Sequence, residues 1–168
     1  MMGYQPTPPY FSWIWNSSCQ SKHKFFAWLI LHDRINTRDM LIRRNWKVPG
    51  SNSCVLCPCG IIEDISHLFF GCNFSRRIWN YLQVDWDYQS GLLSVFEAKK
   101  GFYGPCFVEI IVLACWHIWK QRNKKIFEGI QPSFHLRKSG FVTDVALLKY
   151  RVKKCTVPLL SSWLDKLL

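Results

Sequence analysis

The sequence predicts a mainly α-helical chain: a small helical domain with a Cys-Cys-His-Cys knuckle between helices, followed by a two-helix C-terminal extension. Apolar residues recur at helical spacing in several segments, and breaks that contain Gly or Pro separate these segments. No run of alternating apolar and polar residues is long enough to predict a sheet. Because 49% of the 168 residues are hydrophobic, the chain can bury a substantial core.

Short elements are expected in the N-terminal half. Residues 1–12 are rich in Pro and predict an irregular arm, and the aromatic side chains of residues 11–15 are expected to dock on the core. Residues 24–33 are apolar on most sides, which is typical of a central and largely buried helix. Asn36 or Thr37 is suited to cap the next helix.

Longer elements are expected in the C-terminal half. A short helix over residues 66–71 is followed by one that Asn73 can cap. Residues 106–127 predict the longest helix, because a continuous apolar run there leads into a polar half. A last amphipathic helix is expected over residues 133–154, and Pro158 is expected to end it.

The most informative feature of the chain is a set of three thiols and one imidazole in two close pairs. Two residues separate Cys54 from Cys57 and four separate His67 from Cys72, with nine residues between the pairs. This spacing indicates a closed, four-coordinate Zn²⁺ site, and a closed site is structural and couples local folding to the metal. The expected organisation is an arm over residues 1–12, a zinc-binding domain over 13–84, a linker over 85–105 and a helical extension over 106–168.

Neighbouring residues leave alternatives open at this zinc knuckle. With eight Cys and five His in the chain, such spacings can also arise by chance. Cys59 could replace Cys57 as a ligand or be a spare thiol. Glu63 and Asp64 could hydrogen-bond the second ring nitrogen of His67 or form a solvated acidic turn.

The net charge of +11 is concentrated in two basic regions, residues 22–47 and 117–154, on either side of the nearly neutral knuckle. Basic helices bind phosphate backbones without reading base sequence, and a solvated surface that binds nothing is the alternative. Trp46 could stack on an unpaired base, but the preferred interpretation is a core aromatic that seals its helix. The candidate nucleic-acid contacts are Arg38, Arg43, Arg44, Lys47, Lys120, Arg122, Lys124 and Lys125.

Other function classes are disfavoured by the composition. Residues 1–21 contain no Lys or Arg, so we expect no signal peptide and an intracellular location, nucleus or cytoplasm, where thiols stay reduced. The most apolar run, residues 107–119, is too short and too polar to cross a bilayer, so no membrane association is expected. No aromatic residue precedes a pair of adjacent Asp that could hold two Mg²⁺ ions, and no enzymatic activity is expected.

Several motifs follow one another in a fixed order: Trp13-Ile14-Trp15, then residues 22–29, residues 33–38 and the knuckle of residues 54–72. This order resembles the zinc-binding domain found downstream of the reverse transcriptase in plant non-LTR (LINE-type) retrotransposons. Residues 116–127 resemble the helical segment that often follows that domain. The resemblance places the family's ligand positions on Cys54, Cys57, His67 and Cys72, which leaves Cys59 as a spare thiol.

The resemblance implies a module that accompanies a polymerase and helps to hold RNA or DNA during target-primed reverse transcription. Because the polymerase is absent from this sequence, the chain is expected to be a detached piece of a larger element. The expected function is a non-catalytic structural zinc-binding module that binds RNA or DNA non-specifically, with a reverse transcriptase or other retroelement protein as a candidate partner. The alternative is a zinc-stapled protein-interaction module, or a retroelement remnant with no independent activity.

Overall fold

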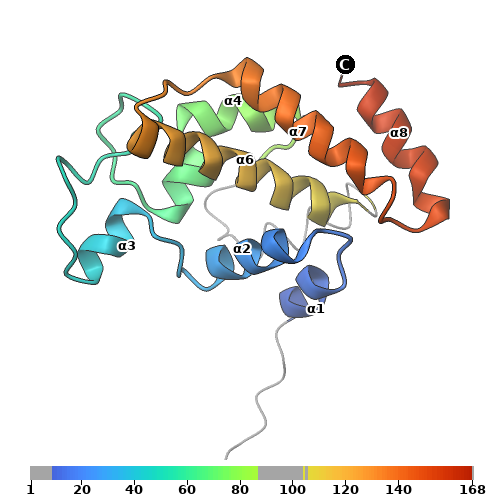
Figure 1. Cartoon of the computed structure of the whole chain (residues 1–168), viewed down its shortest axis with the longest axis horizontal. Helices are drawn as coiled ribbons and strands as arrows, with labels where there is room; N and C mark the ends of the chain where they lie inside the picture. The colour runs from blue at the N-terminus through green and yellow to red at the C-terminus, as the bar shows by residue number, and fades with distance from the viewer. Residues whose placement is uncertain (1–8, 87–103, 105, 168) are drawn as a thin grey trace, which may run out of the picture.

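Helix α6, Phe107–Glu128, runs through the middle of the molecule, and the other helices pack around it (Figure 1). The structure is a computed structural model and describes residues 9–86, 104 and 106–167. Regular structure in these residues is helical, apart from an isolated antiparallel bridge between Ser53 and Ile62. The predicted mainly α-helical fold, with the Cys-Cys-His-Cys cluster between helices, is confirmed.

The arrangement of the helices follows their apolar faces. Helices α7 and α2 and the turn η1 pack on α6, while α1 packs on α2, α4 on η1 and α8 on α7 (Figure 1). In chain order the elements are α1 (Pro9–Trp15), α2 (Ser21–Leu31), α3 (Arg38–Arg43), the π-helical turn η1 (His67–Gly71), α4 (Asn73–Tyr81), α6, α7 (Phe134–Leu148), the 3-10 turn η3 (Lys154–Thr156) and α8 (Val157–Asp165).

The N-terminal half of α6 is enclosed by the rest of the chain. Every side chain from Phe107 to Ile118 is buried except that of Trp116, which is half-buried. A helix that is apolar on all sides is stable only inside a protein, as the sequence predicts for this segment. Gly129 ends the helix with a φ of 69°, a left-handed conformation that favours glycine. Among the described helices, none combines the length and apolar character that crossing a membrane requires.

The N-terminal aromatic residues are more exposed than predicted. Residues Pro9–Trp15 form α1, in which Ile14 is buried and Trp13 packs against the core as predicted, whereas Phe11 and Trp15 are exposed. The predicted irregular arm therefore ends earlier, and its residues 1–8 lie outside the described part of the chain.

Helix α2 is not the central helix that its composition predicts. Phe26, Ala27 and Ile30 are buried on the face that packs on α6, but Phe25 is 54% exposed. The prediction is wrong because α6 occupies the centre, so that α2 can bury only one face.

Of the two helix caps discussed, the sequence predicts the one at α3 correctly and the one at α4 incorrectly. The Thr37 hydroxyl accepts a hydrogen bond from the N–H of Met40 at 3.2 Å, as predicted for a residue that begins α3. Asn73 is the first residue of α4 and Cys72 is its N-cap, so the capping role predicted for Asn73 is wrong.

The C-terminal part contains a helix in addition to the two that were predicted. Helix α7 ends at Leu148, earlier than predicted, and its buried residues include Phe141 and Val145. Pro158 does not end a helix but lies in the first turn of α8, where its missing N–H has no intrahelical partner to lose. Of the predicted linker, residues 87–103 and 105 lie outside the described part.

A single apolar core joins the two parts of the chain that the sequence predicts as domain and extension. Phe26 of α2, Phe69 of η1 and Trp119 of α6 meet with ring centroids 6.0 to 6.4 Å apart. Trp79 of α4 is 1% exposed and donates its indole N–H to the carbonyl oxygen of Phe69 at 2.7 Å. Helix α6 is therefore packed directly on the turn that carries His67.

Candidate metal centre

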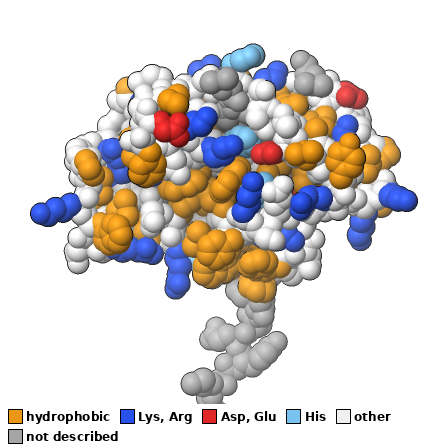
Figure 2. Space-filling view, in the orientation of Figure 1, with side chains coloured by type: hydrophobic (Ala, Val, Ile, Leu, Met, Phe, Trp, Pro, Cys, Tyr) orange, Lys and Arg blue, Asp and Glu red, His pale blue; other side chains and the backbone are white. Residues whose placement is uncertain are grey.

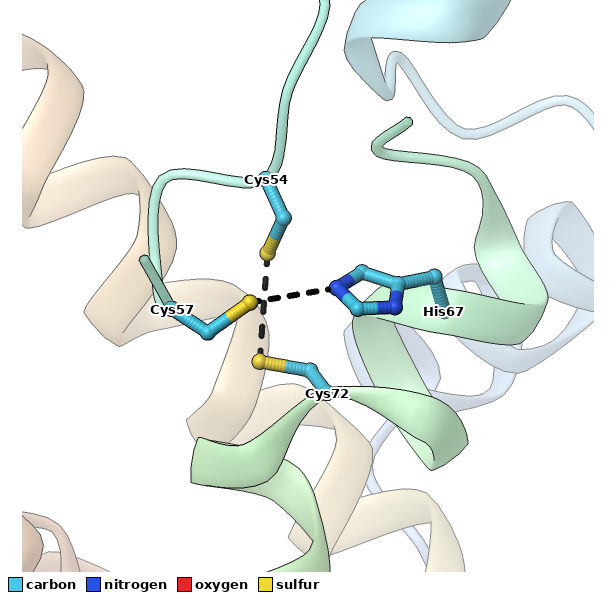
Figure 3. Close-up of side chains that lie close together, drawn as sticks. All are labelled: Cys54, Cys57, His67 and Cys72. Carbon is cyan, nitrogen blue, oxygen red and sulfur yellow. Dashed lines mark hydrogen bonds between the residues drawn. The ribbon is translucent and has the colours of Figure 1, made fainter. Parts of the chain in front are cut away.

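Three sulfur atoms and one imidazole nitrogen converge on one point between the knuckle loop and η1 (Figure 3). All four ligand atoms lie within 4.8 Å of one another; Cys54 Sγ is 3.8 Å from Cys72 Sγ, and Cys57 Sγ is 3.3 Å from His67 Nε2. A tetrahedral Zn²⁺, with bonds of ~2.3 Å to sulfur and ~2.0 Å to nitrogen, spaces such pairs about 3.8 and 3.5 Å apart. The cluster therefore has the dimensions of a four-coordinate metal site.

The first ligand pair lies on a loop that the isolated bridge closes. The N–H of Cys54 donates to the carbonyl oxygen of Ile61 at 2.8 Å, and the N–H of Glu63 donates to that of Asn52 at 2.9 Å. Gly60 turns the chain between them with a φ of 69°. These contacts hold the loop so that both thiols of the pair point inward (Figure 3).

The second pair is set by the π-helical turn. The N–H of Cys72 donates to the carbonyl oxygen of His67 at 2.6 Å, so the four intervening residues close a wider turn than an α-helix. At the start of the turn, the carboxylate of Asp64 accepts a hydrogen bond from the backbone N–H of His67 at 2.7 Å. Asp64 thus holds the first turn of η1 through the His67 backbone, which is neither the bond to the imidazole nor the solvated acidic turn that the sequence leaves open.

Hydrogen bonds within the cluster divide its thiols into donors and acceptors. Cys72 has a pKa well below that of an ordinary thiol, because its sulfur accepts from Cys54 and from the backbone N–H groups of Phe74 and Ser75. The same bond raises the pKa of Cys54, and burial raises that of Cys57. Since metal ligands must be thiolates, metal binding at this cluster releases protons.

Behind the cluster, Glu63 forms a buried ion pair with Arg122 of α6. Glu63 is 0% exposed and Arg122 is 3% exposed, and Glu63 Oε1 accepts from Arg122 Nη2 at 2.7 Å and from Nε at 3.1 Å. The same carboxylate accepts from the backbone N–H groups of Arg38 at 3.1 Å and Val55 at 3.4 Å. A solvated acidic turn is therefore the wrong interpretation of Glu63, which joins the knuckle, α3 and α6.

This ion pair also corrects the prediction for Arg122. A guanidinium that is buried and bound to a carboxylate is not accessible to a phosphate, so Arg122 is not a surface contact for nucleic acid. Its guanidinium carbon lies 4.7 Å from the ring centroid of Trp119, a further contact inside the protein.

Two more of the predicted contacts are engaged within the fold. Arg38 Nη1 donates to the carbonyl oxygen of Ser51 at 2.5 Å and so holds the loop that precedes the first thiol. Arg43 lies 2.8 Å from both Asp33 and Asp39, which neutralise much of its charge. Of the remaining candidates, Arg44, Lys47, Lys120 and Lys124 are exposed and Lys125 is half-buried.

Trp46 is 67% exposed, so the preferred interpretation of this residue as a core aromatic is wrong. It lies in the chain between Arg44 and Lys47, which are exposed as well. Because Glu63 bonds both to the start of α3 and to Arg122, the basic residues that follow α3 and those on α6 lie near the same end of the molecule (Figure 1).

The structure also places the remaining Cys of the knuckle. Cys59 is exposed and outside the cluster, and its sulfur accepts a hydrogen bond from Asn73 Nδ2 at 3.4 Å. Within the described residues, no other group of three or more His, Cys, Asp or Glu side chains converges on one point.

Comparison with known proteins supports a reverse transcriptase zinc-binding domain in the N-terminal part of the chain. Residues 1–79 match the family model described as zinc-binding in reverse transcriptase. The matched range contains all four residues of the cluster. A search of curated proteins finds no match, and a search of solved structures finds none either.

Proposed function

We propose that the chain is a non-catalytic zinc module of the reverse transcriptase type that binds RNA or DNA without sequence preference. The observation that carries this proposal is the convergence of three thiols and one imidazole at the spacing of a tetrahedral Zn²⁺ site. Cys54, Cys57, His67 and Cys72 fill all four positions, so the ion leaves no site for water or substrate and cross-links the loop to η1. The order of motifs favours a plant LINE-type retrotransposon as the source.

Nucleic-acid binding is supported by exposed charge near the metal cluster. Arg44, Lys47, Lys120 and Lys124 are exposed at the end of the molecule where Glu63 joins α3 to α6, and the whole chain has a net charge of +11. Trp46 adds an exposed indole beside two of these charges. Lys and Arg contacts of this kind bind phosphates without reading bases, and an exposed indole can stack on an unpaired base.

The metal part of the proposal is tested by elemental analysis of the purified protein. We expect about one Zn²⁺ per chain, lost in both Cys57→Ser and His67→Ala together with part of the helical circular dichroism signal. Cys59→Ser is the matched control, because this thiol is exposed and lies outside the cluster. A soluble, folded protein without zinc would contradict the proposal.

The nucleic-acid part is tested by fluorescence anisotropy with a labelled oligonucleotide. Replacing Arg44, Lys47, Lys120 and Lys124 by Gln should weaken binding and flatten the dependence of log K on log [salt]. In the matched control, four exposed basic residues outside this group, Arg151, Lys153, Lys154 and Lys166, are replaced by Gln. Equal losses in both variants, or no binding by the wild type at low salt, would contradict the proposed surface.

A second candidate function is a protein-interaction module, and exposed apolar side chains favour it. Phe11 and Trp15 of α1 are 40% and 38% exposed with ring centroids 5.8 Å apart, and Phe25 of the adjacent α2 is 54% exposed. Neighbouring exposed apolar groups are typical of surfaces that another protein covers. Sedimentation velocity of the zinc-loaded chain tests this candidate, which predicts self-association that added oligonucleotide does not reverse.

A further inference from the structure

Aromatic rings form an exposed row on the outer face of α2, here called the aromatic ladder: Phe25, Trp28 and His32. Phe25 and Trp28 stack with ring centroids 5.8 Å apart and an interplanar angle of 17°. Trp28 and His32 follow at 4.6 Å and 41°. Phe25 is 54% exposed, His32 is exposed and Trp28 is half-buried, so the rings contact one another while their outer side remains accessible to solvent.

The charged side chains that precede and flank the aromatic ladder in the sequence are mostly basic. Residues 9–32 contain no Asp or Glu, but they include Lys22 and Lys24. Arg34, which follows the helix, is exposed and its guanidinium carbon lies 5.8 Å from the ring centroid of Trp28. Figure 2 shows hydrophobic side chains with Lys and Arg side chains around them along the edge that α1 and α2 form in Figure 1.

The nearest acidic residue in the sequence does not cancel this charge. Asp33 follows the ladder directly, and its carboxylate lies 2.8 Å from the guanidinium of Arg43 on α3. The ladder therefore combines partly exposed rings with basic side chains that form no ion pair among the described residues. The ammonium of Lys24 donates to the carbonyl oxygen of Trp15 at 2.8 Å, and that of Lys22 lies 5.8 Å from the ring centroid of Trp116.

We propose that the aromatic ladder is a stacking platform for unpaired bases of an RNA or DNA strand, whose phosphates lie against Lys22, Lys24 and Arg34. The proposal rests on the nucleic-acid binding proposed above and adds to it the form of nucleic acid and a second contact surface. Stacking is tolerant of sequence because every base has a π face, and a positive rim complements a polyanion better than an uncharged protein partner.

The platform distinguishes single strands from duplexes. In a duplex the base faces are stacked on one another, so only the phosphates can reach this surface. In a single strand the bases are free to stack on the rings of Phe25 and Trp28. The ladder should therefore contribute to single-strand affinity and leave duplex affinity unchanged.

The test compares a labelled single strand of mixed sequence with its duplex, using zinc-loaded full-length protein and anisotropy at fixed salt. We expect the double variant Phe25→Ser/Trp28→Leu to bind the single strand about tenfold more weakly and the duplex with unchanged affinity. Phe25→Ser alone, at a largely exposed position, tests the ladder with the least risk to folding. Tyr150→Ser is the matched control, because this ring is 86% exposed and outside the ladder.

The outcomes distinguish the stacking platform from the nucleic-acid binding proposed for the whole chain. If the wild type binds nucleic acid and both ladder variants bind the single strand as tightly, the platform is wrong and the proposed function stands. Equal losses for single strand and duplex also overturn the platform. If the ladder variants instead abolish self-association and leave strand affinity unchanged, the ladder is an interface between copies. If the wild type binds neither form at low salt, both proposals are wrong.

Discussion

The knuckle and the α6–α7 pair both contain buried side chains, but different interactions order them. In the loop that carries the first ligand pair, residues 50–64, the backbone forms no helix, Gly50 and Gly60 have φ values of 77° and 69°, and an isolated bridge closes the loop. In the α6–α7 pair, Phe141 and Val145 of α7 are 0% exposed against the apolar α6. Helices with apolar faces are ordered by burial, whereas a short loop with few hydrogen bonds requires a cross-link, which the proposed zinc ion would supply.

Removing the metal should have the largest effect on stability, and it should destabilise the knuckle before the α6–α7 pair. Structural zinc sites supply about 10–16 kcal/mol of apparent folding free energy in zinc-finger peptides. We expect Cys72→Ser, or a chelator, to remove hydrogen-exchange protection from residues 50–72 while amides of α6 between Phe107 and Ile118 remain protected longest. Loss of hydrogen-exchange protection in α6 first, or at the same time in both regions, would contradict the view that the metal orders the knuckle while burial orders α6 and α7.

Breaking the ion pair that joins the regions should have the next largest effect. Arg122→Met leaves the Glu63 carboxylate buried without its partner, which typically costs about 3–5 kcal/mol of unfolding free energy. The double variant Glu63→Leu/Arg122→Met should cost less than Arg122→Met alone, because neither charge remains. Urea denaturation measures both values.

The matched control for this prediction is the exposed ion pair of Arg43. Its side chain is 47% exposed, so Arg43→Met should change the unfolding free energy by at most about 1 kcal/mol. Comparable effects at Arg43 and Arg122 would show that burial does not set the strength of these pairs.

His23 should make the α2–α6 contact sensitive to acid. Burial, together with the charge of Lys22, lowers the pKa of His23 from 6.5 to about 4 against the opposing effect of Asp144, while His117 and Arg151 lower it further. Between these values the unfolded chain binds a proton that the folded chain does not, so stability falls as the pH drops from 6.5 to 4. The expected loss is up to about 3 kcal/mol.

The pH dependence of urea denaturation for His23→Phe checks this expectation. This variant keeps a ring next to Trp116, which lies 5.1 Å from the His23 ring centroid, and should flatten the slope over this range. The exposed His32 serves as the control, since His32→Gln should leave the slope unchanged. A slope unaltered in His23→Phe would show that other titratable groups cause the acid sensitivity.

The smallest change in stability is expected from a substitution at the contact between α7 and α6. Gly→Ala inside a helix usually stabilises by roughly 0.5–1 kcal/mol, but a Cβ at Gly140 would lie 3.0 Å from Cε1 of His117. Asp144 holds this imidazole at 2.8 Å, so the ring has little freedom to move. We expect Gly140→Ala to lower the thermal unfolding midpoint, with a cost of about 1 kcal/mol, whereas the exposed Ser139→Ala should not. A raised midpoint in Gly140→Ala would show that the two helices can separate slightly.

The features that the sequence predicts well depend on near neighbours. The four cluster residues are recognised because their spacing within each pair already contains the geometry of a metal site. Thr37 is recognised as a cap because the acceptor and the N–H that it satisfies are three residues apart.

The features that the sequence does not predict depend on distant parts of the chain. Arg122 lies in a basic run, residues 120–125, and only the packing of α6 shows that this position faces inward while Lys120 and Lys124 face solvent. Its partner Glu63 is 59 residues away, so no local pattern connects them. The exposure of Trp46 and Phe25 is equally hidden, because aromatic residues are usually buried and composition alone favours the core.

The Glu63–Arg122 pair has a consequence for the order in which the protein is completed on the ribosome. Fifty residues separate Cys72 from Arg122, which corresponds to about 2.5–10 s of synthesis at ~5–20 residues per second. All four cluster residues are thus synthesised before α6, and Glu63 has no ion-pair partner until Arg122 emerges. Binding of the proposed zinc ion can therefore precede the packing of α6 over this carboxylate.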